Sequence, residues 1–258
     1  VEINKVISNM KIVGLVNVQI AYVNDQVYLL EVNPRASRTI PFVSKALGIP
    51  LARIAARVMA GKSLEELNFK GVPEIKGFCV KEAVMPFNKF QNVDPILGPE
   101  MRSTGEVMGI GDTFAEAFEK AEVAAGVDIP KTGSVFISVR DTDKQFLSQI
   151  IPSLNQEGFK LIATKGTANI IKDMGYKVMQ IKKVLEGRPN IVDLMKNKEV
   201  NLVINTTEGR ESIKDSASIR RTALDQKICC TTTIQGAKAI CEVLSKKVDW
   251  SYQKLQDM

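Results

Sequence analysis

The spacing of hydrophobic and polar positions changes once along this chain, at a turn-rich connection over residues 126–133. Before the connection, alternating strand patterns are mixed with amphipathic helix patterns at 49–60 and about 112–125. After it, apolar runs of strand length alternate regularly with helix-period runs. The pattern therefore predicts two domains, an α+β domain over 1–127 and an α/β domain over 128–258.

The second domain contains five consecutive strand–helix units. Because a helix follows each strand, neighbouring strands can run parallel, and the pattern predicts one doubly wound sheet of five parallel strands. The predicted strands are 134–140, 159–163, 177–181, 200–205 and 227–231, and the predicted helices are 142–157, 167–174, 189–197, 213–226 and 234–246.

Two apolar segments of the first domain predict an antiparallel hairpin. The run from Gly14 to Gln19 is joined by turn residues at 24–26 to a second strand that carries Glu31 and Asn33 near its end. With a three-residue loop, Gln19 falls opposite Glu31. The two-residue period of a strand then puts Glu31 and Asn33 on the same face.

These polar side chains suit a site for a metal ion and a polyphosphate. Mg²⁺ prefers oxygen ligands and is usually held by one or two carboxylates together with nucleotide phosphates. The guanidinium of Arg35, directly beyond the strand, suits bidentate binding of a phosphate or carboxylate. We therefore interpret Gln19, Glu31, Asn33 and Arg35 as one binding site.

Polar residues of the second domain gather at the carboxyl ends of the predicted strands, where ligands bind in open α/β sheets. They are Lys144, Thr164, Thr167, Lys183, Asn205 and Thr207. The two threonines flank a small-residue turn that leads into a helix, whose first N–H groups favour an anion. We expect the first four residues to converge on one phosphate and the last two to be available to a base or ribose.

Composition argues against several other classes of function. The 258 residues include no histidine, and the four cysteines lack a Cys-x-x-Cys spacing, so we expect reduced thiols in a cytoplasmic protein and no zinc site. No apolar stretch approaches the roughly 18 residues of a membrane helix. The net charge of +6 comes with one Trp, four Tyr and no dense Lys/Arg run, so we expect small anionic ligands and no nucleic acid.

Longer runs of the sequence resemble a known family. Gln19 together with the run 31–45 resembles the metal-binding end of an ATP-grasp domain. The runs 55–64, 86–90 and 97–109 resemble the carbamoyl-phosphate synthetase large subunit, in its second, carbamate-phosphorylating half. The resemblance covers nearly the whole chain, and the second domain resembles the methylglyoxal-synthase-like regulatory domain of that family.

The resemblance implies a partial ATP-grasp domain over 1–127 and a methylglyoxal-synthase-like allosteric domain over 128–258. It implies that the intact enzyme makes carbamoyl phosphate from bicarbonate, glutamine-derived ammonia and two ATP, for pyrimidine and arginine biosynthesis. A glutaminase small subunit would be its partner, and we expect a homo-oligomer. The residues that would hold the Mg²⁺ or Mn²⁺ of ATP are Gln19, Glu31 and Asn33, and those that would contact phosphate are Arg35 and Arg38.

The resemblance also implies effector sites in the second half of the chain. UMP would be the inhibitor and IMP the activator. The matching residues are Ser138, Lys144, Thr164, Thr167, Lys183, Asn205, Thr207 and Asp215. Some bacterial members also bind ornithine, for which the matching positions are Glu82 and Thr232.

Other interpretations differ in what they predict. Residues 1–12 carry no glycine-rich phosphate loop, so we expect the lobe that closes over ATP to lie upstream and this chain alone to be inactive. A lyase like methylglyoxal synthase is not expected, because the stretch 185–190 lacks that enzyme's acidic motif and the chain has no histidine base. A stand-alone nucleotide-binding regulatory module and a different ATP-grasp ligase with its own sensor domain both remain open.

Overall fold

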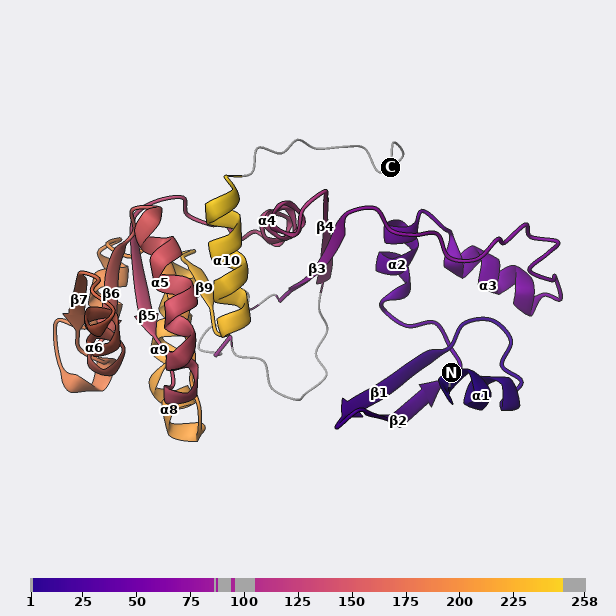
Figure 1. Ribbon diagram of the computed structural model, residues 1–258, viewed down its shortest axis with the longest axis horizontal. Helices are drawn as coiled ribbons and strands as arrows, with labels where there is room; N and C mark the ends of the chain where they lie inside the picture. Colours follow the sequence, from indigo (N-terminus) through magenta and orange to yellow (C-terminus); the bar gives the residue numbers. More distant parts are fainter. Residues whose placement is uncertain (1, 86, 88–93, 96–104, 248–258) are drawn as a thin grey trace. The chain divides into compact units, whose positions relative to one another are not determined.

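The computed structural model describes residues 2–85, 87, 94–95 and 105–247. The chain forms two compact units that divide between Lys76 and Gly77 (Figure 1). Each unit is described by itself.

The first unit consists of a two-stranded hairpin and three helices: α1 (Glu2–Asn9), β1 (Asn17–Val23), β2 (Gln26–Asn33), α2 (Ile40–Leu47) and α3 (Leu51–Met59). The helix predicted at 49–60 is confirmed as α3. The preceding helix, α2, ends at Gly48, which adopts the left-handed conformation (φ 65°) that glycine accepts without steric cost.

The predicted hairpin is present, with a turn one residue shorter than expected. Asn24 and Asp25 both have positive φ (50° and 59°), as in a two-residue type I′ turn, so Gln26 belongs to β2. A register shift between Gln19 and Ile20 then adds one residue on the β2 side. Gln19 therefore pairs with Glu31, as the sequence predicted, although the predicted three-residue loop was wrong.

The first unit has no fully buried side chain among its described residues 4–76. Both faces of the hairpin are open, with Tyr22 67% and Leu30 65% exposed. The helices α2 and α3 also contain no buried residue. Within these residues the hairpin is therefore held by its own backbone ladder more than by a core.

The second unit begins with an antiparallel pair, β3 (Phe78–Val84) and β4 (Gly105–Gly111), and the helix α4 (Phe114–Ala124). The elements that follow are β5 (Ser134–Ser138), the 3₁₀ helix η2 (Asp141–Phe146), α5 (Leu147–Gln156), β6 (Lys160–Thr164), α6 (Lys165–Asp173), β7 (Val178–Ile181), η3 (Val184–Glu186), α7 (Ile191–Lys196), β8 (Leu202–Asn205), α8 (Arg210–Asp215), α9 (Ala217–Asp225), β9 (Cys229–Thr231) and α10 (Ile234–Lys246).

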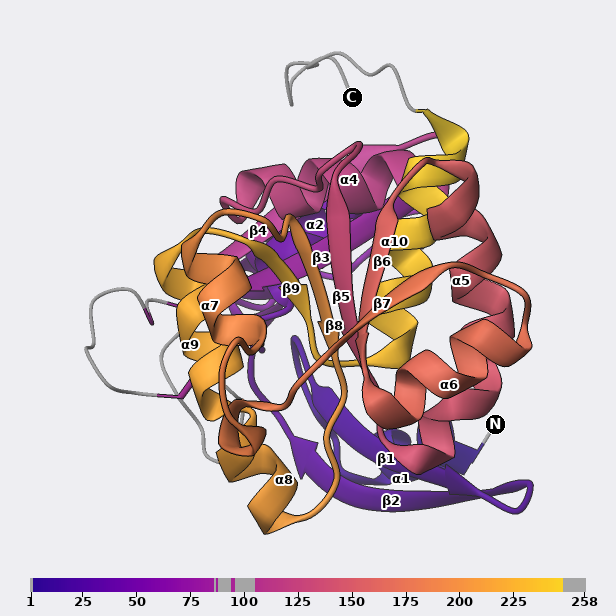
Figure 2. The same cartoon turned by 90° about the vertical axis from the view of Figure 1, so that its left-hand side faces the viewer.

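The five strands from β5 onward form one all-parallel sheet in the order β7-β6-β5-β8-β9. Figure 2 shows α5 and α10 on one side of this sheet and α7 and α9 on the other. The predicted doubly wound fold is confirmed. Two predicted helices are divided: the one at 142–157 opens as η2, and the one at 213–226 is separated at Ser216 into α8 and α9.

Alternate residues of β5 serve opposite faces of the sheet. Val135 and Ile137 pack with α5 and α10 in the larger core, and Phe136 packs with α7 and α9 in the smaller one. All three side chains are fully buried. This alternation follows from the two-residue period of a strand and explains why the strand reads as continuously apolar.

The helix α4 joins the pair β3 and β4 to the sheet domain. Its residues Ala117 and Ala121 are fully buried, and Ala115 belongs to the larger core with α10. A Cβ on Gly109 of β4 would lie 1.9 Å from the backbone oxygen of Ala117, so only glycine permits this close approach. The compact units therefore divide about fifty residues before the predicted boundary at 126–133, and the limits of the family domains remain a prediction.

Candidate functional site

The first candidate site lies on the hairpin of the first unit. Asn33 donates a hydrogen bond from Nδ2 to Oε1 of Glu31 (2.6 Å), which places both side chains on the same face as predicted. Gln19 lies opposite Glu31 in the register, and the backbone N–H of Arg35 bonds to the carbonyl of Asn33 (2.8 Å). Gln19, Glu31, Arg35 and Arg38 are exposed.

The donor set of the hairpin fits Mg²⁺ or Mn²⁺ with nucleotide phosphates. Glu31 supplies a carboxylate, and Gln19 and Asn33 supply amide oxygens, which are hard ligands of the kind these ions prefer. One carboxylate cannot neutralise a divalent cation, so phosphate oxygens would complete its coordination. That these residues bind a metal ion remains a prediction.

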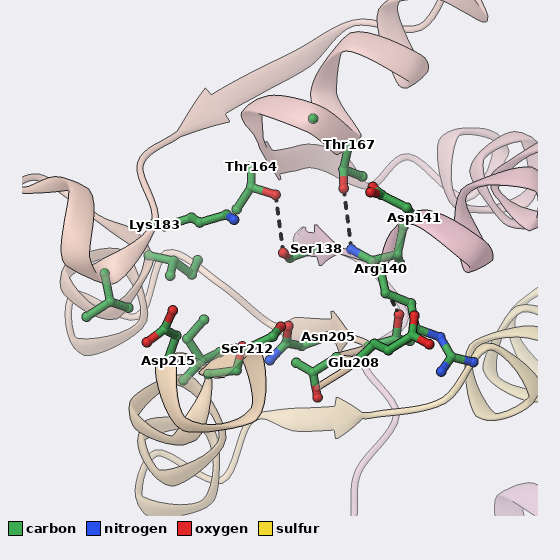
Figure 3. Close-up of a pocket in the computed structure, with 18 of the residues that line it drawn as sticks. Ser138, Arg140, Asp141, Thr164, Thr167, Lys183, Asn205, Glu208, Ser212 and Asp215 are labelled. Carbon is green, nitrogen blue, oxygen red and sulfur yellow. Dashed lines mark hydrogen bonds between the residues drawn. The ribbon is translucent and has the colours of Figure 1, made fainter. Parts of the chain in front are cut away.

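The second candidate site is a pocket of about 660 Å³ at the carboxyl ends of the parallel strands. All eight residues predicted for a nucleotide effector line it, although they come from five separate segments: Ser138, Lys144, Thr164, Thr167, Lys183, Asn205, Thr207 and Asp215. In Figure 3, Thr164, Thr167 and Lys183 lie on one side of the pocket, and Asn205, Ser212 and Asp215 lie on the other. Nucleotide binding at this pocket is a prediction.

Hydrogen bonds between distant residues fix the upper part of the pocket. The hydroxyls of Ser138 and Thr164 lie 3.2 Å apart, and the backbone N–H of Val139 donates to Oγ1 of Thr167 (3.3 Å). These contacts join β5 to the start of α6 and appear as dashed lines in Figure 3. Thr164 and Thr167 are only 5% and 1% exposed, so their positions are fixed by packing as well.

The start of α6 offers backbone donors to an anion. Thr164 occupies the N-cap position without a side-chain capping bond, and the first turn contains no acidic residue. Lys144 reaches over this turn: its Nζ lies 3.3 Å from the point that a Cβ on Gly166 would occupy. Unsatisfied N–H groups, a helix N-terminus and a lysine amine together make a site suited to phosphate.

Asn205 is buried with an unused donor. Its side chain is 1% exposed, and its Nδ2 has no hydrogen-bond partner in the described part of the chain. Leaving a buried polar group unpaired costs about 1–3 kcal/mol. Because Asn205 lines the pocket, a ligand with a carbonyl or hydroxyl acceptor would satisfy this group.

The remaining lining residues include apolar and charged side chains that the sequence patterns do not identify. The apolar ones include Val184, Leu185, Ile191 and Ile219, which suit the face of a base. The charged ones include Arg140, Asp141, Glu186 and Glu208. The position of Arg140 and Asp141 between the first parallel strand and Lys144 is the sequence signal that could have identified them.

The two residues matched to ornithine lie in the second unit. Glu82 is a half-buried residue of β3, and Thr232 is exposed directly after β9. Loss of solvent raises the pKa of Glu82. Burial and the neighbouring charge of Glu82 also raise the pKa of Glu122, on α4, to about 7. Glu122 was not predicted, because its place on an amphipathic helix suggested only packing.

The four cysteines are free, with Cys229 and Cys241 buried and Cys79 and Cys230 half-buried. Burial raises the pKa of Cys241 to about 11 and that of Cys230 to about 12, so both remain protonated thiols at neutral pH. Among the described residues, the helices are too short or too polar to cross a membrane.

Two family models match parts of this chain: one match includes the hairpin site, and the other includes the pocket residues from Thr164 onward. Residues 2–67 match the family model described as carbamoyl-phosphate synthase L chain, ATP binding domain, and residues 147–232 match the MGS-like domain. A crystal structure of methylglyoxal synthase from Elizabethkingia anophelis NUHP1 covers 44% of this chain and 79% of its own, at 19% identity and a TM-score of 0.37.

Two bacterial proteins match nearly the whole chain. The carbamoyl phosphate synthase large chain of Pseudomonas syringae pv. tomato is 55% identical over 257 residues, which are 100% of this chain and 24% of the relative. The protein of the same name from Pasteurella multocida is 54% identical over 246 residues, covering 95% of this chain and 23% of the relative. The chain thus spans about a quarter of the length of these curated relatives, and the predicted resemblance is confirmed.

Proposed function

This chain is similar over its whole length to about a quarter of the length of carbamoyl phosphate synthase large chains, and from this premise we propose that it contributes to two sites of such a ligase. One is part of the ATP site that phosphorylates carbamate, and the other is a nucleotide effector site. The intact cytoplasmic enzyme would use bicarbonate, two ATP and ammonia from a glutaminase subunit, and would serve pyrimidine and arginine biosynthesis. The chain alone would not synthesise carbamoyl phosphate.

In the first proposed site, Glu31 and Asn33 hold Mg²⁺ or Mn²⁺ together with Gln19, and Arg35 and Arg38 orient the phosphates. The metal ion, when bound, would neutralise phosphate charge during transfer. The shared face of Glu31 and Asn33 and the pairing of Gln19 with Glu31 support this assignment. In the intact enzyme, Glu31→Gln should abolish synthesis while UMP binding stays unchanged.

In the second proposed site, UMP and IMP compete for the pocket at the strand ends. The observation that carries the proposal is the convergence of all eight predicted residues on one pocket of about 660 Å³. The N-terminus of α6, Lys144 and Lys183 would receive the phosphate. The buried amide of Asn205 would donate to the ribose or base, and the nearby apolar residues would pack on the base.

Calorimetric titration of the purified chain with UMP, IMP, uridine and inorganic phosphate tests the effector site. UMP and IMP should bind and compete with each other, and uridine should bind at least tenfold more weakly, because it lacks the phosphate. Uridine binding as tightly as UMP would contradict the placement of the phosphate. In the intact enzyme, UMP should also change the rate of carbamoyl phosphate synthesis, whereas a stand-alone module or another ligase would show no such change.

A second ligand is favoured by the carboxyl groups of Glu82 and Glu122. The two neighbouring carboxyls are partly buried, and among the described residues no positive charge contributes to the raised pKa of either one. The amine of ornithine would supply that charge, with Thr232 as a further contact. Ornithine should stabilise the chain against heat more at pH 8 than at pH 6, and Glu82→Gln should remove this stabilisation.

A further inference from the structure

Asp141 lies where the proposed phosphate should bind. It follows β5 in the opening turn of η2 and lines the pocket. Its Oδ1 is 2.6 Å from Nζ of Lys144, while 92% of its side chain remains exposed. The bond to Lys144 and the charge of the more distant Lys183 lower the pKa of Asp141, so its carboxylate is ionised at neutral pH. One negative charge of the protein is therefore already beside the two lysines of the phosphate site.

The charged residues that line the pocket include fewer cations than carboxylates. Arg140 is engaged by the buried Asp143 through an Nε–Oδ2 bond of 2.8 Å. The remaining cations among the described lining residues are Lys144 and Lys183. The carboxylates that line the same pocket are Asp141, Glu186, Glu208 and Asp215. One phosphate can be matched by two lysines and the start of α6, but a second or third phosphate would meet an excess of negative charge.

Among the four carboxylates, Asp141 is the one placed to act on the phosphate end. Glu186 accepts a hydrogen bond from the backbone N–H of Lys183 at 2.9 Å, which holds it within its own turn. Figure 3 shows Glu208 and Asp215 on the β8–α8 side, across the pocket from Thr164 and Thr167. Among these four carboxylates, Asp141 alone forms an ion pair with the side-chain amine of a phosphate-site lysine in the described part of the chain.

We propose that Asp141 restricts the pocket to ligands with a single phosphate, so that nucleoside monophosphates bind and the corresponding di- and triphosphates are rejected. This inference rests on the proposed effector function of the pocket and adds the residue that limits the number of phosphates. The incoming monophosphate replaces Asp141 as the partner of Lys144. Each further phosphate remains close to the displaced carboxylate without a cation to match it.

The test is calorimetric titration of the whole chain with UMP, UDP, UTP and inorganic phosphate, without divalent cations. The variants are Asp141→Asn, which removes the charge, and Asp141→Glu, which keeps it. Asp173→Asn is the matched control, because Asp173 is an exposed acid at the far end of α6 and does not line the pocket. Exposed charges a few ångströms apart change affinity about two- to fivefold per added charge.

The wild-type chain should bind UMP at least tenfold more tightly than UTP. Asp141→Asn should reduce this ratio about three- to tenfold, Asp141→Glu should retain it, and Asp173→Asn should leave it unchanged. Equal affinity of the wild type for UMP and UTP, or an unchanged ratio in Asp141→Asn, would overturn the inference. If UMP still binds and Lys144→Ala still weakens it, the effector site itself survives that result. Failure of the wild type to bind UMP at all would overturn both proposals.

Discussion

The hairpin site of the first unit is held by neighbours in the sequence, whereas the pocket of the second unit is held by residues far apart in the chain. On the hairpin, Glu31 is bonded to Asn33, two residues away. In the pocket, the backbone of Arg140 bonds to Thr206 across 66 residues, and the hydroxyls of Ser138 and Thr164 meet across 26. The pocket is therefore a property of the whole sheet and is organised before any ligand arrives.

The two sites also differ in what surrounds them. The central strands next to the pocket, β5 and β8, contain fully buried side chains such as Phe136 and Ile204. The strands of the hairpin have no buried residue. Binding at the hairpin must include the free energy of ordering exposed side chains, whereas the buried pocket residues Thr164, Thr167 and Asn205 have lost that freedom during folding. The geometry of the pocket should thus depend on the stability of the sheet. The geometry of the hairpin site should depend on ligands and packing partners.

Among the substitutions that test this comparison, Phe136→Ala should cause the largest loss of folding stability. Removing a fully buried aromatic side chain from the central strand costs about 3–5 kcal/mol. The matched change on the hairpin, Leu30→Ala, should cost less than about 0.5 kcal/mol, because Leu30 is 65% exposed. Urea unfolding followed by circular dichroism measures both. Similar losses for the two variants would show that the hairpin is better packed than its exposure indicates.

Gly109→Ala should have the next largest effect, about 2–3 kcal/mol. The new Cβ would collide with the backbone oxygen of Ala117, at 1.9 Å, and push α4 away from β4. A matched control is Gly126→Ala, where no atom lies within 4 Å and only the positive φ of 84° opposes the change. If Gly109→Ala leaves the unfolding of the sheet domain unchanged, α4 does not belong to that folding unit.

Lys144→Ala should weaken UMP binding about ten- to a hundredfold, because a charge-assisted hydrogen bond contributes roughly 1.5–3 kcal/mol. Lys172→Ala provides the control, since Lys172 is exposed near the other end of α6 and lies outside the pocket. Calorimetry at low and high salt should show the difference shrinking as ions screen the charges. An unchanged affinity would place the phosphate elsewhere.

Glu122→Gln should change how stability depends on pH. The pKa of Glu122 is raised to about 7 in the folded chain, above its ordinary value of 4.5, so the folded state holds the proton more strongly than the unfolded state. Its contribution to stability is present below pH 4.5 and is lost as pH rises through 7. The variant should therefore be more stable than wild type at pH 8 by about 1 kcal/mol, after allowance for partial exposure.

The two curves for Glu122→Gln and wild type should converge below pH 4.5, where Glu122 is protonated in both the folded and the unfolded states. Thermal unfolding between about pH 4 and 8 measures this difference. Glu242→Gln is the control, because Glu242 is exposed on α10 of the same unit. Parallel curves for Glu122→Gln and wild type would show that Glu122 is charged throughout the range.

Much of the second unit could be predicted because its signals are local and repeated. The apolar run of β5 and the polar residues Ser138 and Thr164 at strand ends follow from period and position alone. The parallel order of the strands then brings those residues together. The pairing of Lys144 with Asp141 could not be predicted in this way. It depends on a 3₁₀ turn, whereas the sequence pattern predicted this segment only as part of a longer helix.

The position of α4 could not be predicted for a different reason. Its amphipathic pattern puts Ala117 and Ala121 on the buried face. This pattern predicts that the helix packs against another part of the protein, but it does not indicate which unit provides that surface. The turn-rich connection at Gly126 predicts a boundary between family domains, and in the structure the helix before this connection packs with α10 after it. Packing between distant segments decides such divisions, and no local pattern encodes it.

The register shift between Gln19 and Ile20 has a consequence for how this hairpin tolerates changes in loop length. The two-residue turn at Asn24 and Asp25 sets one alignment, and the extra residue on β2 restores the pairing of Gln19 with Glu31. A third residue inserted into the turn could be matched by loss of the bulge, so the strand ends that carry the polar side chains would keep their alignment. The bulge thus isolates the proposed ligands from insertions and deletions at the hairpin tip.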